Sequence, residues 1–138
     1  MVYDPNNIFA RILRGELPKI AIYEDDLTLA FMDVAPATEG HTLVIPKEAA
    51  ETIFDLSPEG AAATIKTTQK VAAAVKKALG VPGIMIVQLN DKAAGQSVPH
   101  LHFHILPREH GYDMDFHGRK IAEFARLVPI AEKIKAAL

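Results

Sequence analysis

Apolar residues in the first third of the chain recur at two periods, one typical of helices and one typical of strands. Residues 8–13 place their apolar side chains on one face of a short helix, which Asn6 or Asn7 can cap and Gly15 can end. Short β-branched and apolar segments follow, bounded by polar or proline-containing turns. The strands predicted in this part of the chain are 20–24, 28–33 and 41–45, the last of them ended by Pro46.

One long helix dominates the middle of the chain. Its predicted start is Ser57-Pro58-Glu59, because the hydroxyl can cap, proline fits the first turn and the carboxylate favours the positive end of the helix. The helix is expected to run to Leu79, with Gly80 after it and a buried stripe formed by Ala61, Ile65, Ala72, Val75 and Leu79. Two further strands are predicted at 84–89 and 98–106, and a last amphipathic helix at 129–137.

The order of these elements predicts the fold class. Strands gather around one helix instead of alternating with helices, and one connection is as short as a hairpin. Both features favour an α+β fold with a five-stranded antiparallel sheet. No repeat, linker or low-complexity tract divides the chain. We therefore expect residues 1–138 to form a single domain, with a core at 6–108 and a C-terminal segment at 109–138 that contains the last helix.

Composition argues against several classes of protein. The 138 residues carry a formal net charge of −2, which gives no general attraction to polyanions, so nucleic acid is not an expected partner. The absence of cysteine removes disulfides, zinc–thiolate sites and cysteine nucleophiles. No apolar stretch approaches the roughly 20 residues that span a bilayer, and residues 1–7 lack the basic start and apolar run of a signal peptide. We expect a cytoplasmic protein with no membrane partner.

Three histidines alternate with apolar residues in the last predicted strand. Successive side chains of an extended chain point to opposite faces, so His100, His102 and His104 share one face and the apolar residues between and after them share the other. A lone histidine in a core strand is more often structural than functional, but three in strict alternation indicate a functional site. His110 and His117 lie outside this pattern in a polar segment and are expected at the surface.

Two chemistries fit these three imidazoles. A zinc site could take two of them plus a ligand from elsewhere, with His41 or an acid as candidates, because the outer two lie roughly 13 Å apart on a straight strand. Alternatively, the central imidazole attacks phosphorus while its neighbours carry protons and neutralise charge. The preceding loop, residues 90–97, offers small residues, backbone N–H groups, an amide and a hydroxyl that suit phosphate oxygens, and it favours phosphoryl chemistry.

The segment from Gly95 to Arg108 resembles the signature of the histidine triad (HIT) family of nucleotide hydrolases and transferases. Four more blocks resemble the family in the same order, at 7–18, 23–26, 30–36 and 40–47. The resemblance covers residues 6–108, about three quarters of the chain. It implies a HIT-like fold that pairs through its long helix and a strand into a homodimer.

The resemblance also implies roles for four histidines. His102 would be the nucleophile that attacks the α-phosphate of a nucleotide and forms a nucleotidyl-imidazole intermediate. His104 would contact the phosphate and help protonate the leaving group, His100 would orient the nucleophile, and His41 would be a supporting fourth histidine. An imidazole suits this chemistry, because its ordinary pKa of about 6.5 leaves a useful fraction neutral and nucleophilic near pH 7.

Further positions resemble the family's nucleotide pocket. Ser97 and Gln96 match positions that line the phosphate and leaving group, Asp33 matches the acid that binds the ribose hydroxyls, and Asn90 matches a further pocket position. The walls of the base pocket match Ile8, Phe9 and Phe31. A purine nucleotide is the implied substrate.

Two departures from family patterns bear on metal and substrate. Some relatives carry a Cys-x-x-Cys pair that helps bind a structural zinc, but here these positions are Asn7 and Ala10, so no such zinc is expected. The chain also has no tryptophan, whereas the phosphoramidate-cleaving branch commonly carries one in its C-terminal segment. Its Pro107-Arg108 ending instead resembles bacterial triad proteins and those acting on dinucleoside polyphosphates.

The function implied by this resemblance is hydrolysis at the α-phosphate of a nucleoside phosphoramidate or a (di)nucleoside polyphosphate. The reaction would pass through a nucleotidyl-histidine intermediate and use no metal or cofactor. Two alternatives stay open, a purine-nucleotide-binding regulatory module with little turnover and a zinc hydrolase with histidine ligands. A nucleotide trapped on His102 would decide in favour of the hydrolase with a nucleotidyl-histidine intermediate.

Overall fold

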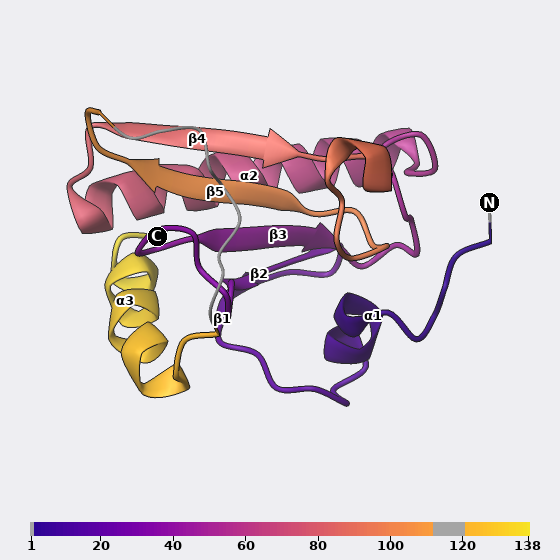
Figure 1. Cartoon of the computed structure of the whole chain (residues 1–138), viewed down its shortest axis with the longest axis horizontal. Helices are drawn as coiled ribbons and strands as arrows, with labels where there is room; N and C mark the ends of the chain where they lie inside the picture. The colour runs from indigo at the N-terminus through magenta and orange to yellow at the C-terminus, as the bar shows by residue number, and fades with distance from the viewer. Residues whose placement is uncertain (1, 112–120) are drawn as a thin grey trace.

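The computed structural model describes residues 2–111 and 121–138. Within them, five strands form one antiparallel sheet in the order β1-β2-β3-β5-β4 (Figure 1). The strands are β1 (Ala21–Glu24), β2 (Thr28–Met32), β3 (Thr42–Pro46), β4 (Gly83–Gln88) and β5 (Phe103–Arg108). The helices are α1 (Ile8–Leu13), α2 (Pro58–Leu79) and α3 (Phe124–Ala136), with a short 3₁₀ turn at Lys92–Ala94. The predicted α+β class and five-stranded antiparallel sheet are confirmed.

The sheet is covered on both faces, by different helices. α2 and α3 pack on one face, where an apolar cluster joins them to the strands through Met32, Val44, Val75, Ile105, Ala131 and Ile134. α1 packs on the opposite face, in a cluster formed by Phe9, Ile12, Leu29, Phe31, Leu43 and Ile45. Because β2 and β3 are covered on both faces, every residue of these two strands is buried, and their sequences lack the alternation of a half-exposed strand.

Local capping sets the ends of α2 where the sequence predicts them. The Ser57 hydroxyl accepts a hydrogen bond from the N–H of Gly60 at 2.9 Å, and Gly80 ends the helix in the left-handed conformation with a φ of 63°. The predicted buried stripe is wrong at Ile65, which is 49% exposed. Neighbouring threonines are buried in its place: Thr64, Thr67 and Thr68. Their hydroxyls are satisfied internally, two by the carbonyl four residues earlier and one by a threonine of β2, so these polar side chains are compatible with the core.

β5 begins later than predicted. His100 and His102 lie before the strand, so the predicted strand that carries all three histidines is wrong, and only His104 belongs to β5. The chain before β5 bonds to the end of β3 and to the loop after it. The N–H of Leu101 donates to the Ala50 carbonyl at 2.9 Å, and Nε2 of His100 donates to the Pro46 carbonyl at 2.8 Å. These tertiary hydrogen bonds replace the strand pairing that the local alternation predicts.

α3 begins at Phe124, ahead of its predicted start, so Pro129 lies inside the helix and removes one backbone hydrogen bond. Burial of Leu127, Ala131 and Ile134, each at most 3% exposed, offsets this cost. The other predicted elements agree with the structure to within one residue at each end. Among the described residues, no helix has the length and apolar character needed to cross a bilayer.

Candidate functional site

A cavity of about 490 Å³ beside α1 brings most of the predicted site residues together. The predicted polar residues that line it are Asp33, His41, Ser97, His102 and His104. The predicted base-pocket residues Ile8, Phe9 and Phe31 line it too. Phe9 makes edge-on ring contacts with Phe31 and His102, with centroids 5.4 Å and 4.9 Å apart, so the apolar wall directly adjoins the central histidine.

The ring of His102 is held by the backbone of its own segment. Its Nδ1 lies 2.7 Å from the carbonyl oxygen of His100. A carbonyl only accepts, so we assign the proton to Nδ1, and the neutral ring then has its lone pair on Nε2. The side chain is nearly buried and lines the cavity. The path of the chain through these residues thus presents an imidazole nitrogen that can act as a nucleophile.

His100 has a different position from the other two triad histidines. It is completely buried and does not line the cavity. Its Nε2 donates to the Pro46 carbonyl at 2.8 Å, and its Nδ1 lies 2.6 Å from the hydroxyl oxygen of Tyr3. Burial lowers the pKa of His100 below the ordinary 6.5, and the hydrogen bond to Pro46 partly opposes that shift. The ring is therefore a neutral group that anchors the chain in front of His102.

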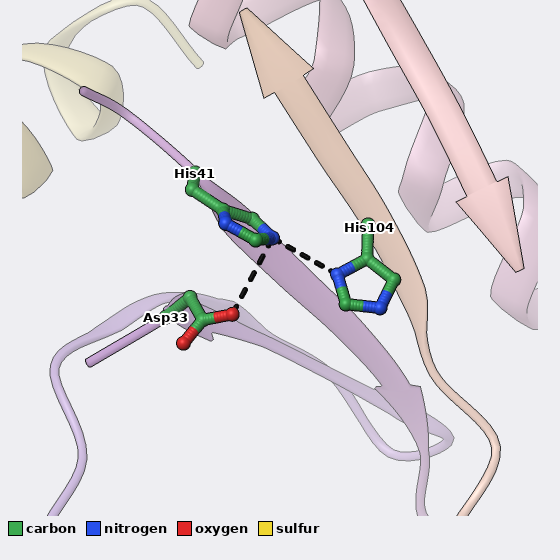
Figure 2. Close-up of side chains that lie close together, drawn as sticks. All are labelled: Asp33, His41 and His104. Atoms are coloured by element: carbon green, nitrogen blue, oxygen red, sulfur yellow. Dashed lines mark hydrogen bonds and ion pairs between the residues drawn. The ribbon is translucent and has the colours of Figure 1, made fainter. Parts of the chain in front are cut away.

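His41, which precedes β3, contacts His104 of β5 and Asp33 at the end of β2 (Figure 2). Nε2 of His41 lies 2.9 Å from Nδ1 of His104 and 3.4 Å from Oδ2 of Asp33. The N–H of Ala37 donates to Nδ1 of His41 at 3.0 Å, so the proton of neutral His41 is on Nε2. That proton is donated to Nδ1 of His104, which leaves the proton of neutral His104 on its own Nε2.

The donor set of Asp33, His41 and His104 also bears on metal binding. Among the residues that the structure describes, these three form the group whose potential ligand atoms lie within 4.8 Å of one another. A metal at Nε2 of His41 needs a lone pair there, but the Ala37 N–H occupies Nδ1 and keeps the proton on Nε2. As arranged, the group fits a hydrogen-bonded cluster better than a cation site.

Besides His100, two further predicted site residues lie outside the lining of the cavity. Gln96 is 7% exposed, and its side-chain amide makes three hydrogen bonds to backbone atoms of its own loop and of the loop before α2. Asn90 bonds to the side chain of Gln88 and accepts from the N–H of Ile53 at 2.8 Å. Both side chains therefore hold the loop that leads to Ser97, and any contact with a ligand stays a prediction.

Other sequence predictions concern residues away from the cavity lining. Asn7 and Ala10, where some relatives carry cysteines, are joined by a helix cap in which Oδ1 of Asn7 accepts from the N–H of Ala10 at 2.9 Å. His110 is exposed, as the sequence predicts. His117 lies outside the described residues.

The cavity also has walls that the sequence does not predict. Leu17 and Lys19, from the connection between α1 and β1, line it, and so do Ile121 and Phe124 from the C-terminal segment. Phe124 is 39% exposed and Ile121 is 78% exposed, so both present apolar surface outside the core. Their position depends on the packing of α3 against α2 and β1, which no local pattern or motif of these residues reveals.

Comparison with known proteins identifies the family of this chain. A family model described as the HIT domain matches residues 14–111. The adenosine 5′-monophosphoramidase of Schizosaccharomyces pombe is 42% identical over 101 residues, which cover 73% of this chain and 73% of that protein. A crystal structure of a HIT-like protein involved in cell-cycle regulation from Bartonella henselae, with an unknown ligand, has a TM-score of 0.93 at 46% identity and covers 100% of both chains. A zinc-bound histidine triad protein from Mycobacterium smegmatis has a TM-score of 0.83 at 34% identity, covering 96% of this chain and 92% of that one. The chain therefore belongs to the histidine triad (HIT) family.

Proposed function

We propose that this protein is a HIT-type hydrolase that transfers the nucleotidyl group of a purine nucleotide first to His102 and then to water. The bond cleaved is the P–N bond of a nucleoside phosphoramidate or a phosphoanhydride bond of a (di)nucleoside polyphosphate, at the α-phosphate. One observation carries the proposal, the 2.7 Å hydrogen bond from Nδ1 of His102 to the carbonyl of His100. It leaves the lone pair on Nε2 of a side chain that lines the cavity.

The proposed reaction consists of two displacements. In the first, the Nε2 lone pair of His102 forms a bond to the α-phosphorus, and the bond from phosphorus to the leaving group breaks. His104, held by His41 with its proton on Nε2, donates to the departing atom, so the leaving group departs protonated. In the second, water attacks phosphorus and gives a proton to Nε2 of His104, which restores the proton that His104 donated in the first step. The N–P bond breaks, and a nucleoside monophosphate leaves with His102 neutral again.

The other residues of the cavity support a nucleoside as the bound group. The carboxylate of Asp33 can accept hydrogen bonds from ribose hydroxyls, while Phe9 and Phe31 offer aromatic surface to a base. The Ser97 hydroxyl can donate to an oxygen of the phosphate or the leaving group. The Schizosaccharomyces pombe relative is an adenosine 5′-monophosphoramidase, which supports a purine nucleoside phosphoramidate as substrate.

Intact-protein mass spectrometry after rapid mixing with adenosine 5′-phosphoramidate or a diadenosine polyphosphate tests the intermediate. We expect an adduct of one nucleoside monophosphate on the parent chain and none on His102→Ala. The matched control is His110→Ala, which removes an exposed histidine outside the cavity and should retain the adduct. An adduct retained by His102→Ala would contradict the proposal. Nucleotide binding with neither an adduct nor a burst of leaving group would indicate a regulatory module instead.

A zinc hydrolase is the second candidate function. The closeness of Asp33, His41 and His104 favours it, and one of the similar structures is zinc-bound. If the proposed mechanism is right, activity survives removal of divalent metal by a chelator, since no step uses a metal as Lewis acid. Activity that is lost on chelation and restored by stoichiometric zinc would support the zinc hydrolase.

We also propose that the chain forms a homodimer through α2 and β4. β4 is an edge strand of the sheet, and its Ile86 is 46% exposed, while Ile65 on α2 is 49% exposed. An edge strand with exposed apolar side chains is suited to pairing with a second copy. Sedimentation equilibrium should give twice the chain mass, and Ile86→Glu should shift the equilibrium towards the monomer. A parent chain that is monomeric at micromolar concentration would contradict the proposal.

A further inference from the structure

A tyrosine that lies before the region matched by the family model contacts the first histidine of the triad. The hydroxyl oxygen of Tyr3 is 2.6 Å from Nδ1 of His100. The two rings meet edge-on, with centroids 5.7 Å apart and an interplanar angle of 69°. Because the family model begins at residue 14, this contact adds a residue from outside the recognised domain to the histidine network.

The direction of this hydrogen bond follows from the other side of the His100 ring. Nε2 of His100 faces the Pro46 carbonyl at 2.8 Å, and a carbonyl can only accept, so Nε2 carries the proton. Burial keeps the ring neutral by lowering its pKa, so Nδ1 bears a lone pair. Burial also raises the pKa of Tyr3, whose hydroxyl therefore stays protonated and donates to Nδ1.

The N-terminal segment holds Tyr3 in place independently of His100. Both the backbone N–H and the side-chain Nδ2 of Asn7 donate to the carbonyl of Asp4, at 3.3 Å and 2.7 Å. Nη1 of Arg14 donates to the carbonyl of Pro5 at 2.6 Å. Asn7 also caps α1, so the segment that carries Tyr3 is fastened to a helix that lines the cavity.

We propose that Tyr3 is a positioning residue for the nucleophile, acting through His100. With the Tyr3 hydroxyl on one nitrogen and the Pro46 carbonyl on the other, the His100 ring has one orientation and one tautomer. The backbone carbonyl of His100 accepts a hydrogen bond from the Nδ1–H group of His102. An ordered His100 therefore holds the nucleophile in its reactive tautomer. This role rests on the proposed function, in which Nε2 of His102 attacks phosphorus.

Tyr3→Phe tests the hydroxyl, because it keeps the ring and removes only the donor. We expect kcat to fall about two- to tenfold, the factor that one net hydrogen bond provides. KM should stay unchanged, since Tyr3 does not line the cavity. The ¹⁵N spectrum of the imidazoles should show His102 losing its single Nδ1–H tautomer. The matched control is Tyr23→Phe, which removes a hydroxyl that donates to Asp25 at 3.0 Å outside the cavity. This variant should change neither kcat nor the His102 spectrum.

Tyr3→Leu removes the aromatic ring as well as the hydroxyl. Comparing it with Tyr3→Phe distinguishes the effect of the hydrogen bond from the effect of ring packing. Both Tyr3 variants should show the same loss of kcat at a temperature well below their Tm. The proposal is overturned if kcat of Tyr3→Phe stays within experimental error of the parent, if only Tyr3→Leu is slow, or if the His102 spectrum is unaltered. If the parent chain forms no nucleotidyl adduct, the proposed function fails, yet the His102 spectrum of Tyr3→Phe still decides whether Tyr3 orders the network.

Discussion

His41 and His104 lie 63 positions apart in the chain, yet Nε2 of His41 is 2.9 Å from Nδ1 of His104. The pairing of β3 with β5 produces this contact, because Leu43 lies opposite His104 in the register and His41 is two residues before Leu43. A histidine outside the triad thereby sets the tautomer of a histidine within it. The residue that we propose as proton donor thus depends on a neighbouring strand for its orientation.

His41→Ala should impair catalysis more than binding. Without the donor at Nδ1, His104 can adopt the other tautomer, so its Nε2 no longer carries the proton for the leaving group. We expect kcat to fall about 100-fold, the lower end of the range for loss of general acid catalysis, and the free energy of unfolding to fall by about 1–3 kcal/mol. Steady-state kinetics and chemical denaturation measure the two effects. A KM increase with unchanged kcat would contradict this role.

Asp33→Asn should discriminate between substrates with and without ribose hydroxyls. In the parent, the N–H of Ala35 donates to Oδ1 of Asp33 at 2.9 Å, and the asparagine side chain keeps an oxygen that can accept this hydrogen bond. The variant removes only the negative charge that Asp33 offers to the ribose hydroxyls. For adenosine 5′-phosphoramidate we expect kcat/KM to fall about tenfold, and for the 2′,3′-dideoxy analogue much less. Equal losses for both substrates would mean that Asp33 acts through His41, which it approaches at 3.4 Å, and not through the sugar.

Phe124→Ala should weaken substrate binding while leaving the protein stable. The ring lines the cavity but is 39% exposed, so its removal leaves little empty core. We expect KM to rise about three- to tenfold through loss of aromatic contact with the base, with kcat unchanged. Phe54→Ala is the matched control, since Phe54 is 80% exposed and does not line the cavity. Equal KM values for the two variants would remove the C-terminal segment from the binding site.

His100 should couple stability to pH. Burial lowers its pKa below 6.5 in the folded chain, so the unfolded chain binds a proton at pH values where the folded chain does not. Its contribution to the free energy of unfolding is complete above about pH 6.5 and is lost as the pH falls below that value. The Tm of the parent should therefore drop more steeply from about pH 7 to pH 5 than the Tm of His100→Gln.

The control for this pH dependence is His110→Gln, which removes an exposed histidine and should keep the slope of the parent. Each variant is compared with its own Tm at neutral pH, so a uniform loss of stability does not affect the result. If His100→Gln and the parent lose stability in parallel, His100 is not the group responsible.

Features that depend on atoms close together in the chain were predictable from the sequence. α2 begins and ends as expected because Ser57 caps through Gly60 and Gly80 adopts a left-handed conformation, both local events. The resemblance to the family, built on the alternation of histidines with apolar residues, predicted His102, His104, Asp33 and Phe9 as site residues, and the structure places these four around one cavity. Their chemical roles stay proposals.

Only the tertiary structure decided how the three triad histidines differ. Alternation predicted three rings on one face of one strand, but hydrogen bonds to Pro46 and Ala50, about 50 positions earlier, draw the chain out of the strand before Phe103. His100 is consequently buried beneath the site while His102 lines the cavity. A local pattern specifies which way successive side chains point, but partners from distant segments compete for the same backbone and ring atoms, and only packing of the whole chain settles that competition.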